Sequence, residues 1–335
     1  MRSPIVIFRD VETMIKNPLN KRSAVLRAID EAHGNLLKVM TEIHPGQLVL
    51  SFNTSAVHNK IIRRVAEING VPPVHDKSGL RGPYMTVPFG KALADVLVPN
   101  TVTKVLHTEK YFNSDLDGFT IRESRYYSPL DSQARAIRSF DRPVILIDDL
   151  LHKGYRMNII DPILKKNEVD VRKIVVGVMT GNARDAMEVR GREVESAYFL
   201  PTLKIWLNER DCYPFIGGDS LTPANDKDGL RSGSINLIMP YTTPVFIADG
   251  NVGEIFRYSM TCLENARNIW QVIEKEYQSI YERKLTLKRI GEVITYPRIP
   301  EMGTGIELDE NLAPTAFIDN AIARLIRLKW GKKKA

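Results

Sequence analysis

The sequence predicts an α/β protein with a mostly parallel sheet, followed by a helical C-terminal extension. Between residues 47 and 200, short apolar runs alternate with stretches of helical periodicity, which is typical of a parallel sheet covered by helices. Within this region, residues 143–157 combine a buried strand, two acids, a glycine turn and the start of a helix. From about residue 236, long apolar stripes at helical spacing replace the alternation.

These changes of pattern divide the chain into an N-terminal extension over 1–42, an α/β domain over 43–235 and a mainly helical module over 236–335. The extension opens on an apolar run at residues 5–8, which predicts an edge strand or a strand that pairs with a partner. Ser23 is then expected to cap a helix that ends near the boundary of the extension.

The α/β domain is expected to alternate between strands and helices, with Gly70 ending the first helix. Residues 75–100 are rich in glycine and proline and are expected to form an insertion or hood, with a short helix at 91–98. The aromatic residues between 201 and 235 are assigned to the core. The remaining elements are strands at 47–52, 101–107, 144–147, 173–179 and 196–200, and helices at 56–69, 161–167 and 184–190.

In the C-terminal module, apolar spacing predicts a long helix over 256–280 and a last helix that opens at Thr315. Two short strands, at 235–239 and 244–248, are expected before them. The basic end of the chain, 329–334, is expected to be a solvated tail, and a nucleic-acid-binding patch is the alternative.

Two adjacent acids, Asp148 and Asp149, follow the apolar strand at 144–147. In an open parallel sheet, ligands bind at the carboxyl ends of the strands, so these acids are candidate ligand-binding residues. The loop beyond them leads into a helix, whose N-terminal N–H groups attract anions. The alternative is that the acids only cap the next helix.

This arrangement resembles the PRPP-binding signature of the type I phosphoribosyltransferases. The resemblance implies that Asp148 and Asp149 bind the ribose hydroxyls, and that His152, Lys153, Gly154, Tyr155 and Arg156 form the loop for the 5′-phosphate. It also implies Mg²⁺, bridging the pyrophosphate and the ribose and held by the two acids through the ribose or through water. The loop departs from the family, in which threonine, serine and small residues surround the glycine. Here lysine, tyrosine and arginine replace them, although lysine and arginine can still bind phosphate.

Two further segments take their expected roles from the same resemblance. Asn53, Thr54 and Ser55 stand where the family has a small loop that contacts pyrophosphate, and an ordinary helix cap is the alternative. Residues 109–130 stand at the position of a mobile loop that closes over PRPP, with Arg122 and Arg125 as candidates for contacting the pyrophosphate.

The resemblance therefore implies a protein that binds PRPP or a ribose 5-phosphate and that, if it is an enzyme, transfers the phosphoribosyl group to an unidentified acceptor with release of pyrophosphate. A non-catalytic protein that senses nucleotides or mediates assembly is the alternative, since the phosphate loop is altered. The net charge of +7 suits an anionic ligand but is too small to indicate a nucleic-acid partner.

The rest of the sequence indicates the compartment of the protein rather than its activity. Two distant cysteines form neither a disulfide framework nor a zinc site, and no dinucleotide or Walker loop is present. No export signal or stretch of about 18 apolar residues is found, so a cytoplasmic protein without a membrane partner is expected. The helical module is expected to pack on the α/β domain or on another subunit, which predicts a homo-oligomer.

Overall fold

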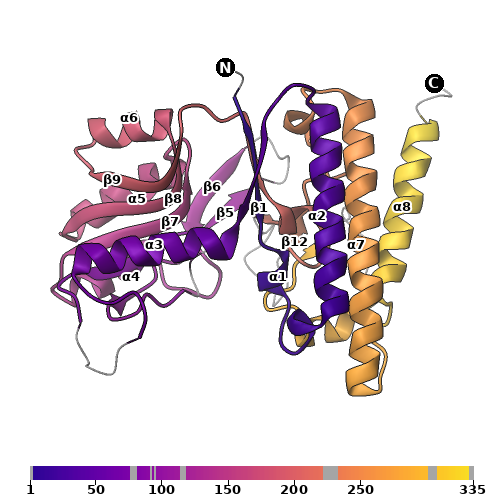
Figure 1. Ribbon diagram of the computed structural model, residues 1–335, viewed down its shortest axis with the longest axis horizontal. Coiled ribbons are helices and arrows are strands. Elements are labelled where there is room, and N and C mark those ends of the chain that lie inside the picture. Colours follow the sequence, from indigo (N-terminus) through magenta and orange to yellow (C-terminus); the bar gives the residue numbers. More distant parts are fainter. Residues whose placement is uncertain are drawn as a thin grey trace. The chain divides into compact units, whose positions relative to one another are not determined.

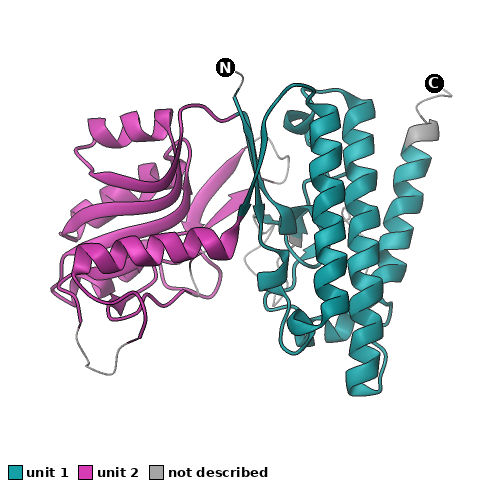
Figure 2. Cartoon of the chain, viewed as in Figure 1, with its two compact units in different colours: residues 1–52, 204–335 teal, residues 53–203 magenta. Residues whose placement is uncertain are grey.

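The computed structural model describes residues 3–75, 81–90, 93, 96–113, 118–221, 233–300 and 308–331. The chain forms two compact units, shown in two colours in Figure 2. Unit 1 contains residues 1–52 and 204–335, and unit 2 contains residues 53–203. These boundaries differ from the expected ones after residues 42 and 235, because the N-terminal segment packs with the C-terminal one.

The three-stranded sheet of unit 1 joins the segment before unit 2 with the segment after it. Strand β1 (Ile5–Arg9) lies between β2 (Val49–Asn53) and β10 (Ile205–Asn208), and it runs parallel to β10. Its first four residues are buried. The apolar run at 5–8 is therefore a central strand, and the prediction of an edge strand was wrong.

Three long helices of unit 1 lie side by side in Figure 1: α2 (Ser23–Ile43), α7 (Val252–Tyr281) and α8 (Pro314–Gly331). They confirm the helices expected from apolar spacing. The stripe on α7 is buried in one core with α2, α8 and β1, and Trp270 is completely enclosed there. The assignment of the aromatic segment after residue 201 to the core is confirmed for Tyr213 and Phe215, whereas Trp206 is exposed.

The remaining elements of unit 1 are short. The strand expected at 235–239 is limited to the end of β12, and the one expected at 244–248 is a 3₁₀ helix, η4. Strand β12 pairs with β11 and β13. The bounds are α1 (Val11–Met14), η1 (Leu19–Lys21), η3 (Glu209–Cys212), β11 (Asp219–Leu221), β12 (Gly233–Ile235), η4 (Val245–Ile247), η5 (Leu287–Glu292) and β13 (Ile299–Pro300).

Unit 2 is built on a parallel five-stranded sheet in the order β4-β3-β7-β8-β9. Strands were expected from the sequence for every member except β3. The bounds are β3 (Met85–Pro88), β4 (Val102–Thr103), β7 (Val144–Leu151), β8 (Val171–Thr180) and β9 (Val194–Leu200). The described chain is thus a mixed α/β protein with a mostly parallel sheet and a helical C-terminal region, which confirms the predicted fold class.

The segment expected to be an insertion or hood, 75–100, contributes β3 to the sheet. All four residues of β3 are buried, because the strand lies between β4 and β7. Of the helix expected at 91–98, residues 91, 92, 94 and 95 lie outside the described residues, and residues 96–98 are not helical. A four-residue run between prolines and glycines carries too little pattern to indicate a strand.

Four helices cover the sheet of unit 2. Helices α4, α5 and α6 share one core with residues of β3, β7 and β8, whereas α3 packs against β7, β8 and β9 and contributes nothing to that core. Helix α5 runs through Pro162, at which the sequence indicated a helix start. The bounds are α3 (Thr54–Asn69), α4 (Leu130–Arg138), α5 (Tyr155–Lys166) and α6 (Gly181–Val189).

The segment over 109–130, expected to be an irregular mobile loop, contains an antiparallel hairpin of β5 (Thr108–Phe112) and β6 (Phe119–Glu123). Residues 114–117, between the two strands, lie outside the described part of the chain. Among the described helices of both units, none is both long and apolar enough to cross a membrane.

Candidate functional site

Three helices of unit 2 begin at the carboxyl edge of the parallel sheet. Helices α5 and α6 start directly after β7 and β8. Helix α3 runs in the opposite direction to the strands: Asn69 at its end accepts a hydrogen bond from the N–H of Tyr84 just before β3, whereas Val57 near its start lies against Gly177 near the end of β8. Helix N-termini carry free N–H groups and partial positive charge, so this edge favours an anion.

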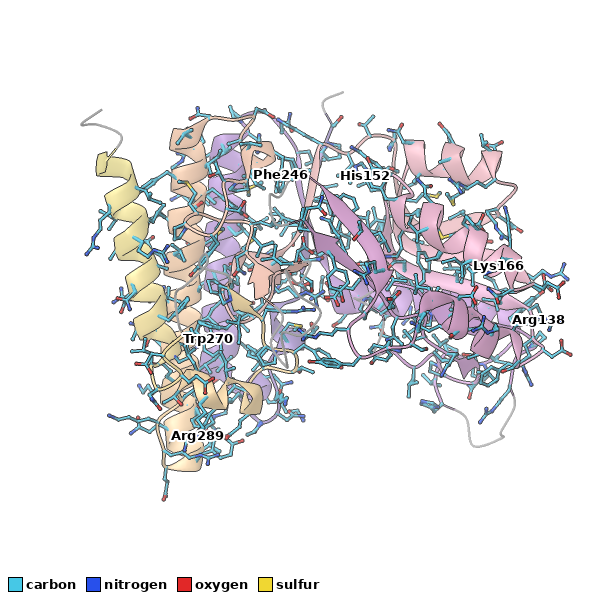
Figure 3. All side chains as sticks on the ribbon, turned by 180° about the vertical axis from the view of Figure 1, so that it is seen from behind. Arg138, His152, Lys166, Phe246, Trp270 and Arg289 are labelled. Carbon is cyan, nitrogen blue, oxygen red and sulfur yellow. The ribbon has the colours of Figure 1, made fainter. Side chains whose placement is uncertain are left out.

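Figure 3 shows the two ends of unit 2. His152, which follows β7, is labelled at one end, while Lys166 and Arg138, the last residues of α5 and α4, lie at the other end. The candidate site is therefore confined to the end that contains His152.

The acid pair lies inside β7, which extends to Leu151, and not after it as expected. Asp148 is 1% exposed and forms an ion pair with Arg156, with 2.5 Å between Oδ2 and Nη1. Gly90 is so close that a Cβ there would lie 1.7 Å from Asp148 Oδ1. Burial raises the pKa of Asp148 well above its usual value, although the Arg156 guanidinium acts in the opposite direction.

Asp149 is more accessible than its neighbour. Its side chain is part-buried, and Oδ1 accepts a hydrogen bond from the N–H of Leu150 at 2.9 Å. The backbone of Asp149 is packed closely against β8, where a Cβ on Gly177 would lie 2.6 Å from the Asp149 carbonyl oxygen. Of the two acids, Asp149 is thus the one with a carboxylate that a ligand can reach.

The predicted phosphate loop is shorter than expected. Only His152, Lys153 and Gly154 connect β7 to α5, because Tyr155 and Arg156 already belong to the first turn of the helix. Gly154 has a φ of 70°, a left-handed conformation that favours glycine.

Thr180, at the end of β8, fixes this loop. Its hydroxyl donates a hydrogen bond to the carbonyl oxygen of His152 at 2.5 Å. Burial, and then the charge of Lys153, lower the pKa of His152, so the imidazole is neutral at pH 7.

Three buried polar atoms at this edge have no hydrogen-bond partner among the residues that the structure describes. They are Thr54 Oγ1, His152 Nδ1 and Arg156 Nε. The predicted pyrophosphate segment supplies the first of them. Asn53 itself caps α3 by accepting a hydrogen bond from the N–H of Ala56, and Ser55 is exposed in the first turn. Since most buried polar groups are hydrogen-bonded, three such atoms at one edge are unusual.

The hairpin of β5 and β6 meets the start of α5. The ring of Phe119 contacts the ring of Tyr155 edge to face, with 5.6 Å between the centroids. Arg122 is exposed on β6, opposite Glu109, and the guanidinium of Arg125 lies over the ring of Tyr126. The contact of these two arginines with a ligand stays a prediction.

Metal binding was predicted at Asp148 and Asp149. Within the described ranges, no cluster of three or more histidine, cysteine or acidic side chains is positioned for a metal ion. Asp148 is already paired with Arg156, so Asp149 offers the one carboxylate of this pair that is open to a cation. Mg²⁺ is commonly bound through one or two carboxylates together with the oxygens of a phosphorylated ligand, and this donor set fits that mode.

The sequence interpretation missed Gly90, Gly177 and Thr180. Gly177 did give a signal, because an isolated glycine inside a strand often marks a close backbone approach. Gly90 and Thr180 gave none, since their importance depends on which strands are neighbours.

Comparison with known proteins gives limited matches. No family model matches the chain, and no curated protein does. Among solved structures, it is similar to a purine phosphoribosyltransferase from Pyrococcus horikoshii, at 12% identity over 46% of this chain and 88% of that one, with a TM-score of 0.29. It is also similar to an adenine phosphoribosyltransferase from Thermoanaerobacter pseudethanolicus, at 13% identity over 46% and 91%, with a TM-score of 0.26.

A third similar structure is the orotate phosphoribosyltransferase of Mycobacterium tuberculosis in complex with PRPP, at 15% identity over 42% of this chain and 72% of that one, with a TM-score of 0.24. At these values, the likeness assigns neither a family nor a ligand to the chain.

Proposed function

We propose that unit 2 binds PRPP or a related ribose 5-phosphate at the carboxyl edge of its parallel sheet, and that it transfers the phosphoribosyl group to an acceptor. One observation carries the proposal. At the edge where α3, α5 and α6 begin, three buried donors or acceptors have no partner in the described part of the chain, and they lie beside an accessible carboxylate, Asp149. Phosphate oxygens and ribose hydroxyls are the groups that such a set would satisfy.

The two acids take different roles in this proposal. Asp149 accepts hydrogen bonds from the ribose hydroxyls. Asp148 is a positioning residue: it holds Arg156, whose remaining N–H groups bind the 5′-phosphate together with the N–H groups that open α5. The exposed Lys153 adds a second cation, and the hydroxyl of Thr54 contacts the pyrophosphate.

Transfer in such a site depends on position and charge more than on a base. The departing pyrophosphate gains negative charge, which the N-terminus of α3 stabilises. Mg²⁺, held by Asp149 and the ligand, would neutralise part of that charge. Arg122 and Arg125 would reach the pyrophosphate from the hairpin.

Calorimetric titration of PRPP with Mg²⁺ tests the binding step. We expect the wild type to bind and Asp149→Asn to lose about 10- to 100-fold in affinity, since a hydrogen bond to a charged group contributes about 1.5–3 kcal/mol. Arg156→Met should lose at least as much.

Asp170 and Arg172 provide matched controls. They form an exposed ion pair at the start of β8, at the opposite edge of the sheet. Asp170→Asn and Arg172→Met should therefore bind PRPP like the wild type. A wild type that is folded but shows no heat of binding would overturn the proposal.

Pyrophosphate release with purine and pyrimidine bases then tests transfer. PRPP binding without release for any base would remove the transferase part of the proposal and leave a ligand-binding unit. Self-association of the chain stays a prediction, which light scattering tests.

A further inference from the structure

Unit 1 contains a hydrogen-bonded row of three side chains that the PRPP proposal does not use. His33 Nδ1 lies 2.8 Å from Glu209 Oε2, and His33 Nε2 lies 2.8 Å from Ser51 Oγ. The three residues come from α2, η3 and β2, segments that are far apart in the sequence and belong to the same unit.

The carboxylate fixes the tautomer of the imidazole. An ionised carboxylate only accepts hydrogen bonds, so the proton of a neutral His33 is on Nδ1 and points at Glu209. The free electron pair is then on Nε2, and the Ser51 hydroxyl donates to it. The hydroxyl proton of Ser51 is therefore directed at a base.

Other buried side chains hold the carboxylate in place. Tyr213 donates its hydroxyl proton to Glu209 Oε1 at 3.1 Å, and Asn265 donates to the Tyr213 oxygen and to the carbonyl oxygen of Ala32 in α2. Burial, and then the charge of Glu209, raise the pKa of Tyr213 well above its usual value, so this hydroxyl keeps the proton that it donates.

Solvent exposure increases from Glu209 through His33 to Ser51. Glu209 is completely buried and His33 is 8% exposed, whereas Ser51 belongs to the exposed residues of β2. A nucleophile must be reached by its substrate, while its base and the acid behind the base must be held rigidly. A network that only stabilised the fold would gain no stability from leaving its serine exposed to solvent.

We propose that Ser51, His33 and Glu209 form a catalytic triad that hydrolyses carboxylic esters. The same order of groups occurs on unrelated folds and is recognised by its geometry. In the first step, Ser51 Oγ bonds to the carbonyl carbon of the ester and its proton passes to His33 Nε2. The bond to the alkoxy oxygen then breaks, and that oxygen leaves with the proton from Nε2.

In the second step, water attacks the acyl-serine and gives a proton to Nε2. The bond between Ser51 Oγ and the acyl carbon breaks, the acid leaves, and Oγ recovers the proton. The Glu209 carboxylate keeps its hydrogen bond with His33 Nδ1 and stabilises the imidazolium. Ser51 and His33 are catalytic residues, and Glu209 is a positioning residue.

The test uses the full-length protein and a fluorophosphonate probe, which reacts with activated serines. We expect stoichiometric labelling of the wild type on the peptide that contains Ser51, and no labelling of Ser51→Ala. The control is Ser139→Ala: Ser139 is also exposed, but its hydroxyl donates to the carbonyl oxygen of Ala136 and not to an imidazole. This variant should react like the wild type.

His33→Asn should lower the labelling rate at least about 100-fold, the range expected for loss of a general base. Hydrolysis of p-nitrophenyl acetate should fall in parallel. Because Ser51 is exposed, Ser51→Ala should fold normally, which circular dichroism verifies, so the proposal can be tested even where His33→Asn does not fold.

The positioning role of Glu209 is tested by a measurement that a purely structural role would not change. In ¹⁵N NMR spectra, His33 of the wild type should show the Nδ1-protonated tautomer, and Glu209→Gln should lose it together with the labelling. A wild type that does not react, labelling that persists in Ser51→Ala, or a His33 proton on Nε2 would each overturn the proposal.

Discussion

At the scale of single residues, Gly90 determines how Asp148 is enclosed. A Cβ at this position would lie within 3 Å of three atoms of the carboxyl group, and Arg156 prevents that group from moving away. Gly34, in the middle of α2, is the opposite case, because an added Cβ would meet nothing within 4 Å.

Gly90→Ala should therefore destabilise unit 2 by about 3 kcal/mol through overpacking, and it should weaken PRPP binding through Arg156. Gly34→Ala should stabilise unit 1 by roughly 1 kcal/mol, because alanine favours a helix over glycine. Urea unfolding of both variants measures the two effects. Equal and small changes would contradict the packing described for Gly90.

Asp10, in unit 1, predicts a dependence of stability on pH. Burial raises the pKa of Asp10 to about 7, while Arg210 lowers it and Asp211 raises it further. Since this pKa is higher in the folded state than in the unfolded one, Asp10 contributes stability to unit 1 that is fully present below about pH 4 and is lost as the pH rises to about 7.

Asp10→Asn should remove that slope, which for one proton reaches at most about 1.4 kcal/mol per pH unit. The free energy of unfolding between pH 4 and 7 measures it. Asp30→Asn, at an exposed acid of α2, should keep the slope. An unchanged slope in Asp10→Asn would assign the pH dependence to other groups.

At the scale of elements, the sequence predicted the long and strongly patterned segments. Helices α2, α3 and α7 were found within a few residues because each buries one regular face, and strands β7 and β8 because each contains a continuous buried apolar run. Strand β3 and the hairpin of β5 and β6 were missed. Their short runs gain burial only from neighbours that a single segment does not reveal.

The candidate site was likewise predicted in part and missed in part. Asp148, Asp149 and the loop to Gly154 could be placed from the order of strand, acids, glycine and helix. The ion pair with Arg156 could not, because the arginine is eight positions away and its direction depends on where α5 begins. The triad of unit 1 was not predicted either, since its members are joined only by folding.

The close packing of α3 on the sheet gives a prediction at this scale. A Cβ on Gly177 would lie 2.3 Å from Val57 Cγ1 and 2.6 Å from the Asp149 carbonyl oxygen. Gly177→Ala should separate α3 from β8, destabilise unit 2 by about 1–3 kcal/mol and weaken PRPP binding.

Adding Val57→Ala should restore part of the stability, because it makes room on the side of the helix. A double-mutant cycle measures this coupling. Strictly additive effects of the two substitutions would show that Gly177 does not determine the position of α3.

At the scale of the whole molecule, each unit has its own hydrophobic core. One core contains residues of unit 1 alone, and the other contains residues of unit 2 alone. The two units should therefore unfold in separate steps, and a substitution in one core should change the unfolding of that unit alone.

Calorimetry should show two transitions. Leu146→Ala should lower the free energy of unfolding of unit 2 alone, and Ile269→Ala that of unit 1 alone. Each loss should be about 2–5 kcal/mol, since both side chains are completely buried. PRPP at 100 times its dissociation constant should raise the free energy of unfolding of unit 2 alone, by about 2.7 kcal/mol. A single transition that moves in both variants would contradict independent cores.

The pairing of Ile5 with Ile205 has a consequence for synthesis of the chain. Strand β1 leaves the ribosome before unit 2, but its parallel neighbour β10 follows only after all of unit 2. Unit 2 is continuous in sequence and can fold as soon as it has emerged. A nascent chain that stops near residue 203 should thus contain a finished unit 2 while the apolar faces of β1 and α2 are still exposed, and chaperones would recognise these faces.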